Sequence, residues 1–216
     1  MVELDGLAKP IEDHSESIVY MGMSLRTRAM VKIQEGCDQV CSYCIVPKVR
    51  GRERSLPVDS IVSRVADYEA QGLKEIVLTG TQLGSYGFDL DRQDLASLLR
   101  GVLERTGIPR IRVSSLQPQD IDDELLDLWN DPRLCPHFHM PLQSGSDVVL
   151  KRMRRRYTAA TYEATADKIR RKVGDVAITA AGLEQAPHGV ALFATGFVLI
   201  IAFAVPQTGL PQPLSN

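Results

Sequence analysis

The sequence has little of what marks a secreted scaffold or a general nucleic-acid binder. It has only four cysteines among 216 residues, three of them in one short stretch, so a disulfide-rich secreted protein is excluded. Its 25 basic and 27 acidic side chains nearly cancel, and the net charge of −2 predicts no general attraction to nucleic acid. No secretory signal peptide is recognisable at the N-terminus, so we expect a cytoplasmic protein.

Charged side chains are absent from residues 185–216. Within that segment VALFATGFVLIIAFAV, residues 190–205, is almost wholly apolar. It is shorter than the roughly 20 residues that a helix needs to cross a bilayer, and it lacks flanking Lys or Arg. We therefore expect no membrane association. A buried helix, a membrane-active segment and a tail unrelated to the preceding domain remain open interpretations.

Between the two ends, strand-like and helix-like patterns alternate. Short segments such as KEIVLTG are separated by amphipathic segments such as LPVDSIVSRVADYEAQG. This alternation predicts an α/β fold of βαβ units with a parallel sheet. Five strands are expected, too few for an ordinary eight-stranded barrel, at residues 29–34, 74–80, 109–116, 135–142 and 175–179. Helices are expected at residues 56–72, 94–107, 121–130, 146–153 and 158–172.

Three cysteines form the pattern Cys37-x3-Cys41-x2-Cys44 at the end of the first expected strand. Three thiolates on one loop can bind three irons of a 4Fe–4S cluster, because such clusters are ligated by cysteine sulfur. The fourth iron then has no protein ligand and is open to a small bidentate molecule. The alternatives are a structural zinc site completed by Cys135 or a histidine, and a set of cysteines without a metal.

Basic residues gather in two places although the whole chain is nearly neutral. Residues 48, 50, 52 and 54 are Lys or Arg, and residues 151–156 read KRMRRR. These clusters either follow a phosphate backbone or are solvated loop and helix faces. His137 and His139 alternate on one expected strand and so share a face, as core or barrel lining, and Trp129 is expected in the core.

Four stretches in order resemble the methylthiotransferase branch of the radical S-adenosylmethionine enzymes: VKIQEGCDQVCSYCIVPKVRGRERS, IVLTGTQLGSYG, RVSSLQP and CPHFHMPLQSGSDVVLKRMRRRYT. The resemblance runs from about residue 26 to residue 179. It is closest to enzymes that add a methylthio group to threonylcarbamoyladenosine in the tRNA anticodon loop. A sister group that acts on a ribosomal protein is the alternative.

The resemblance implies a partial (βα) radical-SAM barrel with its site at the carboxyl ends of the strands. It implies that Cys37, Cys41 and Cys44 ligate a 4Fe–4S cluster whose open iron binds S-adenosylmethionine. A reductant protein would supply the electron that generates a 5′-deoxyadenosyl radical, and no catalytic residue beyond the three ligands is expected. The expected cofactor-binding residues are Tyr43 beside the adenine, with Thr79, Gly80, Thr81, Ser114, Ser115 and Gln143.

The sequence departs from the full-length family pattern at both ends. No cysteine precedes Cys37, so the ligands of the family's second cluster are missing. The resemblance stops near Ala180, where the composition changes. We therefore expect three parts: residues 1–28 as a linker or the end of a missing N-terminal domain, residues 29–180 as a core truncated after about five strands, and residues 181–216 as an unrelated apolar tail.

Three hypotheses about function follow. The first is a tRNA methylthiotransferase in a truncated copy that forms no methylthiolated product by itself. The second is a cluster-bearing domain that cleaves the cofactor but transfers no sulfur. The third is a non-enzymatic, metal-stabilised module that binds RNA through its basic loops.

Overall fold

Five parallel strands form the framework of the part of the chain that the computed structural model describes, residues 27–180 and 201–202. The first three pair in the order β1-β4-β5, and the last two pair with each other. Parallel bridges from Ile111 to Leu134 and from Ser115 to His139 join the two groups. The strands are β1 (Arg28–Lys32), β4 (Glu75–Thr79), β5 (Arg110–Val113), β6 (His137–His139) and β7 (Ala177–Ala180).

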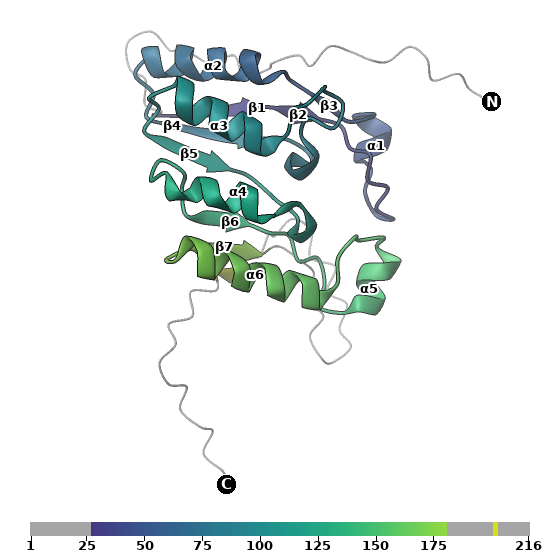
Figure 1. Cartoon of the computed structure of the whole chain (residues 1–216). Coiled ribbons are helices and arrows are strands. Elements are labelled where there is room, and N and C mark those ends of the chain that lie inside the picture. The colour runs from purple at the N-terminus through teal and green to yellow at the C-terminus, as the bar shows by residue number, and fades with distance from the viewer. Residues whose placement is uncertain (1–26, 181–200, 203–216) are drawn as a thin grey trace, which may run out of the picture.

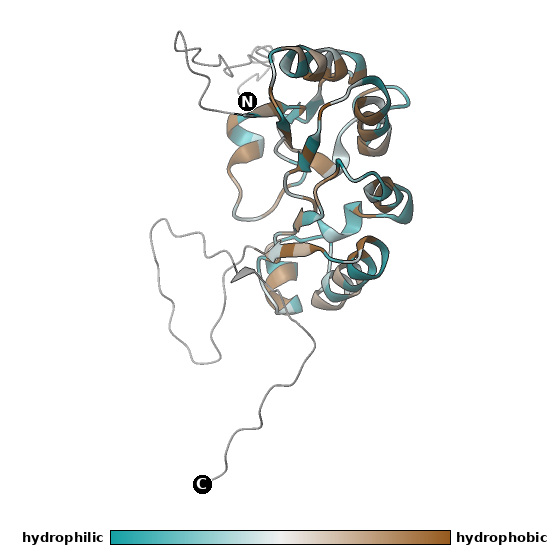
Figure 2. Ribbon diagram, turned by 90° about the vertical axis from the view of Figure 1, so that its left-hand side faces the viewer, coloured by the Kyte–Doolittle hydropathy of each residue, from teal (hydrophilic) through white to brown (hydrophobic). Residues whose placement is uncertain are grey.

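Four helices connect these strands and are stacked along one side of them (Figure 1). They are amphipathic, so hydrophobic and hydrophilic residues alternate along them in Figure 2. In α3 a capping box starts the helix, since Ser97 N donates to Asp94 Oδ1 at 2.7 Å and Asp94 N donates to Ser97 Oγ. The helices are α2 (Val58–Ala70), α3 (Leu95–Arg105), α4 (Asp123–Asp127) and α6 (Ala159–Val173).

The hydrophobic core lies between this helix layer and the strands. Ile76 and Leu78 alternate on β4 with partly exposed residues, and both are fully buried. They belong to one buried cluster with Leu98 and Leu99 of α3. The predicted α/β fold with parallel strands is thus confirmed. The carboxyl ends of the strands lead into loops that carry polar side chains.

A short antiparallel hairpin, which the sequence did not predict, closes the cysteine loop. It pairs β2 (Gln34–Glu35) with β3 (Arg54–Ser55). The expected strand 29–34 is therefore two strands, one in the main sheet and one in the hairpin. Gly36 follows β2 with φ +77°, and a Cβ added to it would lie 2.0 Å from the Arg52 carbonyl oxygen. Only glycine fits this crossing point.

Other boundaries also differ from the predictions, and the expected strand 109–116 already ends at Val113. The expected strand 135–142 is reduced to β6 because Pro136 and Pro141 flank it and lack the N–H that a ladder requires. The expected helix 121–130 consists of α4 followed by a 3-10 turn, Leu128–Asn130. The short helices α1 (Val46–Val49) and α5 (Asp147–Arg152) lie beside the cysteine loop and after β6, respectively.

Most of both chain ends lies outside the described residues, and so do the expectations for residues 1–26, 181–200 and 203–216. Within the apolar stretch 190–205, only β8 (Ile201–Ala202) is described, and it pairs antiparallel with β7. Among residues 27–180 and 201–202, no helix is both long enough and apolar enough to span a bilayer.

His137 and His139 share one face of β6, as predicted, and approach the same hydroxyl group. Thr179 Oγ1 lies 3.0 Å from His139 Nδ1 and 3.3 Å from His137 Nε2. Burial lowers the pKa of both imidazoles, and Arg112 lowers that of His137 further. Trp129 is buried, as predicted, and its ring centroid lies 4.5 Å from that of Phe138.

The histidine pair predicts a pH-dependent stability. Because the pKa of His139 is lower in the folded chain, the unfolded chain binds its proton more readily near the ordinary value of about 6.5. The contribution of the neutral histidine to folding stability should therefore be fully present above that pH and should be lost as the pH decreases. Thermal melts should show a lower Tm at pH 5.5 than at pH 7.5, with a smaller difference in His139→Gln. Equal differences in the two proteins would contradict the account.

The hairpin predicts unequal effects of two glycine substitutions. Gly36 and Gly51 both have positive φ, but a Cβ at Gly51 would meet nothing within 4 Å. Gly51→Ala should therefore lower the free energy of unfolding by about 1–2 kcal/mol, the cost of the left-handed backbone alone. Gly36→Ala adds a collision with the Arg52 carbonyl and should cost roughly 3 kcal/mol or more. Urea denaturation measures both, and equal losses would show that the close approach does not matter.

Candidate cluster and cofactor site

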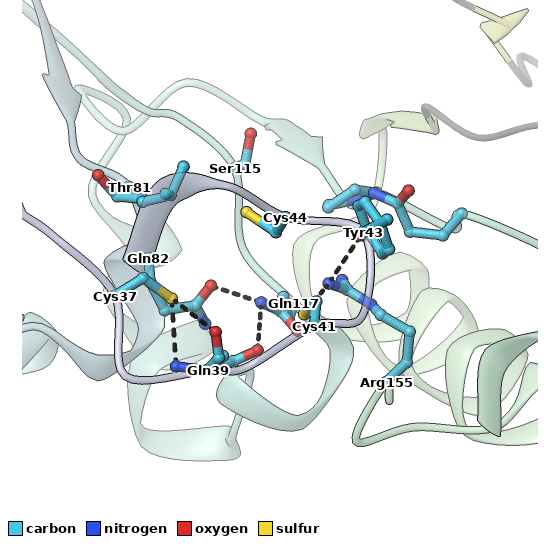
Figure 3. Close-up of a pocket in the computed structure, with 13 residues that line it drawn as sticks. Cys37, Gln39, Cys41, Tyr43, Cys44, Thr81, Gln82, Ser115, Gln117 and Arg155 are labelled. Atoms are coloured by element: carbon cyan, nitrogen blue, oxygen red, sulfur yellow. Dashed lines mark hydrogen bonds between the residues drawn. The ribbon is translucent and has the colours of Figure 1, made fainter. Parts of the chain in front are cut away.

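A cavity of about 230 Å³ lies where the cysteine loop meets the carboxyl ends of the strands (Figure 3). The loop after β4 contributes Thr81, the loop after β5 contributes Ser115, and the loop after β6 contributes Gln143. Residues from five separate segments thus converge on one space. The lining comprises Cys37, Gln39, Cys41, Tyr43, Cys44, Val46, Thr81, Gln82, Ser115, Gln117, Pro141, Gln143 and Arg155.

The three clustered cysteines all line this cavity as free thiols. Cys37 and Cys41 are buried and Cys44 is half-buried. Gln39 N donates to Cys37 Sγ at 3.3 Å, which suits a thiolate. Burial raises the pKa of the Cys37 thiol, and the charges of Glu53, Cys41 and Cys44 raise it further. The hydrogen bond from Gln39 N acts in the opposite direction and lowers this pKa.

A zinc site completed by Cys135 is wrong. Cys135 N donates to Ile111 O at 2.9 Å, near the amino end of β5, and its electrostatic neighbours include Arg110 and Arg112. The cavity lies at the other end of the strands. In the described part of the chain, no three His, Cys, Asp or Glu side chains are grouped as ligands of one metal ion. A cluster does not require such convergence, since each cysteine binds a different iron.

The side chain of Gln34 fixes the loops that carry this site. It is 1% exposed, and its Oε1 accepts hydrogen bonds from Thr81 N at 2.9 Å and Gln82 N at 3.0 Å. Its Nε2 donates to Gly36 O at 3.1 Å. One amide therefore joins the residue before Cys37 to the loop after β4.

Further glutamines extend this connection across the cavity floor. Gln117 Nε2 lies 3.1 Å from Gln39 Oε1 and also donates to Gln82 Oε1. Gln82 Nε2 donates to Asp120 Oδ2 at 2.8 Å. Sequence reasoning missed Gln39, Gln82 and Gln117, although two of them follow expected strands, where polar side chains mark this edge of a parallel sheet.

The structure brings four of the seven expected cofactor-binding residues to the cavity: Tyr43, Thr81, Ser115 and Gln143. Thr79, Gly80 and Ser114 do not line it. Thr79 Oγ1 donates to Val31 O at 3.3 Å. A Cβ added to Gly80 would lie 2.9 Å from Leu83 Cδ2, so its place favours glycine by packing alone. Ser114 N donates to Leu78 O within the sheet.

Arg155, also missed, reaches the cavity from beyond α5. Its Nη1 lies 3.6 Å from Cys41 Sγ and 3.4 Å from Tyr43 Oη (Figure 3). Burial works against its charge, but Tyr157, Tyr43 and Cys41 nearby raise the guanidinium pKa above its ordinary value. The charge therefore remains at any ordinary pH. Arg155 and Cys41 are 114 positions apart in the sequence, so no local sequence pattern predicts their contact.

Known proteins with similar sequences include two tRNA-modifying enzymes. Threonylcarbamoyladenosine tRNA methylthiotransferase MtaB of Thermotoga maritima is 42% identical over 71% of this chain and 36% of its own length. A tRNA-2-methylthio-N(6)-dimethylallyladenosine synthase of Thermoanaerobacter is 43% identical over 70% of the chain and 33% of its own length. The chain thus spans about a third of the curated relatives that it matches.

The fold has solved counterparts. The radical S-adenosylmethionine methyltransferase TsrM of Kitasatospora setae superposes with a TM-score of 0.57 over 71% of this chain and 30% of its own, at 18% identity. The family description Radical SAM superfamily matches residues 31–185, which include the cysteine motif and every residue of the cavity. The chain belongs to the radical SAM superfamily.

Proposed function

We propose that this chain is the radical domain of a tRNA methylthiotransferase. The observation that carries the proposal is the convergence of three free thiols and polar strand-end side chains on one cavity. The names of relatives at 42% and 43% identity add the substrate class and the group transferred. Because the identities to the two relatives are nearly equal, they support a modified adenosine in tRNA as the substrate class. Threonylcarbamoyladenosine is the more specific substrate that we propose.

The residues of the cavity fit a 4Fe–4S cluster with bound S-adenosylmethionine. Cys37, Cys41 and Cys44 would bind three irons, and the fourth would be open to the amino and carboxylate groups of the cofactor. Thr81 Oγ1 is buried and has no hydrogen-bond partner in the described part of the chain, so a hydroxyl is free for a bound molecule. A bound cluster would supply the electron for reductive cleavage of S-adenosylmethionine into methionine and a 5′-deoxyadenosyl radical.

The chain's own side chains would bind and orient the cofactor. Tyr43 is 51% exposed at the cavity and offers a ring face to an adenine. Gln143 lines the cavity from a residue with a left-handed backbone, φ +65°. Ser115 adds a hydroxyl from the loop after β5. The buried glutamine amides hold the surrounding loops in place, so these contacts need little rearrangement on binding. A separate reductant protein would deliver the electron.

A basic surface beside the cavity supports RNA as the substrate. Arg155 borders both this cavity and a second one, which contains one carboxylate among basic and hydroxyl groups and is lined by Asp147, Lys151, Arg155, Arg156, Tyr157, Thr158 and Thr161. Lys151 and Arg156 are exposed, as are Arg152 and Arg154 in the same run. Closely spaced guanidinium and ammonium groups bind phosphates well. A ribosomal-protein substrate or a non-enzymatic RNA-binding module would lead to different results in the two experiments below.

Cysteine substitutions test the cluster. After anaerobic reconstitution with iron and sulfide, the unaltered chain should hold about four irons and as many sulfides. Cys37→Ala, Cys41→Ala and Cys44→Ala should each lose most of both. Cys135→Ala is the matched control, because it removes a buried thiol at the other end of the strands. Iron without sulfide, or equal losses in all four variants, would contradict the proposal.

Charge reversal tests the RNA surface. Lys151→Glu combined with Arg156→Glu should weaken binding of a tRNA anticodon stem-loop and reduce the slope of log K against log salt by about two. Arg171→Glu is the control, since it reverses an exposed charge near the far end of α6. Fluorescence anisotropy at several salt concentrations measures both. An equal loss in the control, or no RNA binding by the unaltered chain, would contradict RNA binding at this surface.

A further inference from the structure

The backbone at the end of α5 fixes the position of Arg155. Arg155 N donates to Leu150 O at 2.9 Å, Arg154 N donates to Lys151 O at 3.0 Å, and Arg154 has φ +58°. These two bonds and the left-handed residue form a Schellman motif, which ends a helix in one defined geometry. Ser42 N also donates to Met153 O at 3.2 Å. The turn that carries Arg155 is therefore tied directly to the cysteine loop.

Tyr157 holds the guanidinium from its other side. Arg155 Nε lies 3.3 Å from Tyr157 Oη, and Arg155 Cζ lies 5.0 Å from the ring centroid. Tyr157 Oη in turn lies 2.6 Å from Pro141 O, in the loop after β6. With Arg155 held at Nε and across its planar face, Nη1 is directed at Cys41 Sγ and Tyr43 Oη.

The remaining nitrogen of this side chain, Nη2, indicates that a negatively charged group binds here. Arg155 Nη2 is buried and has no hydrogen-bond acceptor among the described residues. A buried donor of a charged group without an acceptor is costly, so it is retained where something else supplies the acceptor. No carboxylate forms an ion pair with Arg155 in the described part of the chain, where its side chain bonds a thiol and two tyrosine hydroxyls. The Asp120 carboxylate is near enough for the charge of Arg155 to act on its pKa, but it does not bond the guanidinium, whose positive charge lies beside a cysteine.

We propose that Arg155 is a positioning residue for the iron–sulfur cluster. Arg155 donates a charge-assisted N–H···S bond to Cys41 and thereby raises the reduction potential of the cluster. The inference rests on the proposed function, because it requires the cluster. A hydrogen bond to a ligand sulfur withdraws electron density, and a fixed positive charge stabilises the electron that the cluster gains. The electron comes from an external one-electron reductant, and Arg155 keeps all its protons.

A redox titration tests this inference without any turnover. Arg155→Gln removes the charge, Arg155→Lys keeps it, and Arg156→Gln is the control, since it removes an exposed neighbouring charge that lines only the second cavity. Each protein is reconstituted, its iron is counted, and the reduced cluster is followed by electron paramagnetic resonance against a graded series of reductants. S-adenosylmethionine is left out, so the readout does not depend on activity.

The expected result is full iron in all proteins and a change in potential confined to one of them. In Arg155→Gln the ratio of reduced to oxidised cluster at a fixed potential should fall about tenfold, which is ~59 mV for a one-electron couple. Arg155→Lys should recover most of this change, and Arg156→Gln should not differ from the unaltered chain. Full iron with an unchanged potential in Arg155→Gln would overturn the inference.

A second measurement on the unaltered chain covers the case in which Arg155→Gln does not assemble a cluster. With ¹⁵N-labelled arginine, pulsed electron paramagnetic resonance of the reduced cluster should detect coupling to an arginine nitrogen. Its absence would overturn the inference. If the unaltered chain binds no cluster, the proposed function fails together with the inference. If it binds one without arginine coupling, only the inference fails.

Discussion

The buried amide of Gln34 is the interaction on which the site most depends. Its carbonyl oxygen accepts from two successive backbone N–H groups after β4, and its nitrogen donates to the carbonyl of Gly36. No water reaches these groups in quantity, since the side chain is 1% exposed, so each unmade bond would carry the full cost of desolvation. The bonds therefore hold the start of the cysteine loop at a fixed distance from the loop after β4.

The amino and carboxyl ends of the strands carry different kinds of side chain. At the amino ends, Glu75 forms ion pairs with Arg28 at 3.0 Å and with Arg112 at 2.8 Å, which join neighbouring strands. At the carboxyl ends, side-chain amides and hydroxyls replace charged pairs and leave a cavity between them. Arg155 adds a positive charge to this otherwise neutral lining, and it lies beside a cysteine. Such separation of stability from function is typical of parallel βα folds.

Much of this arrangement could be predicted from the sequence, because it depends on local patterns. The alternating strands and helices, the cysteine triplet and the buried Trp129 all follow from periodicity or spacing. The choice between Gly80 and Thr81, or between Ser114 and Ser115, does not. Side chains alternate in direction near the end of a strand, so an error of one residue places a side chain on the wrong face.

The features that were missed are contacts between distant segments. The β2–β3 hairpin depends on the approach of Gly36 to Arg52, and the glutamine connection joins residues up to 78 positions apart. Arg155 belongs to a basic run that is otherwise exposed, and only its turn and Tyr157 distinguish it from its neighbours. Sequence patterns report which face of an element is buried, but they do not report which polar side chains meet across a cavity.

The central claim is that three thiols of this chain bind a cluster and leave one iron open to a small molecule. Mössbauer spectroscopy of the chain reconstituted with ⁵⁷Fe, with and without S-adenosylmethionine, tests it most directly. The account predicts that the cofactor changes the signal of one iron site in four and leaves the other three as they were. A spectrum that does not respond to the cofactor, or one without a four-iron cluster, would contradict the account.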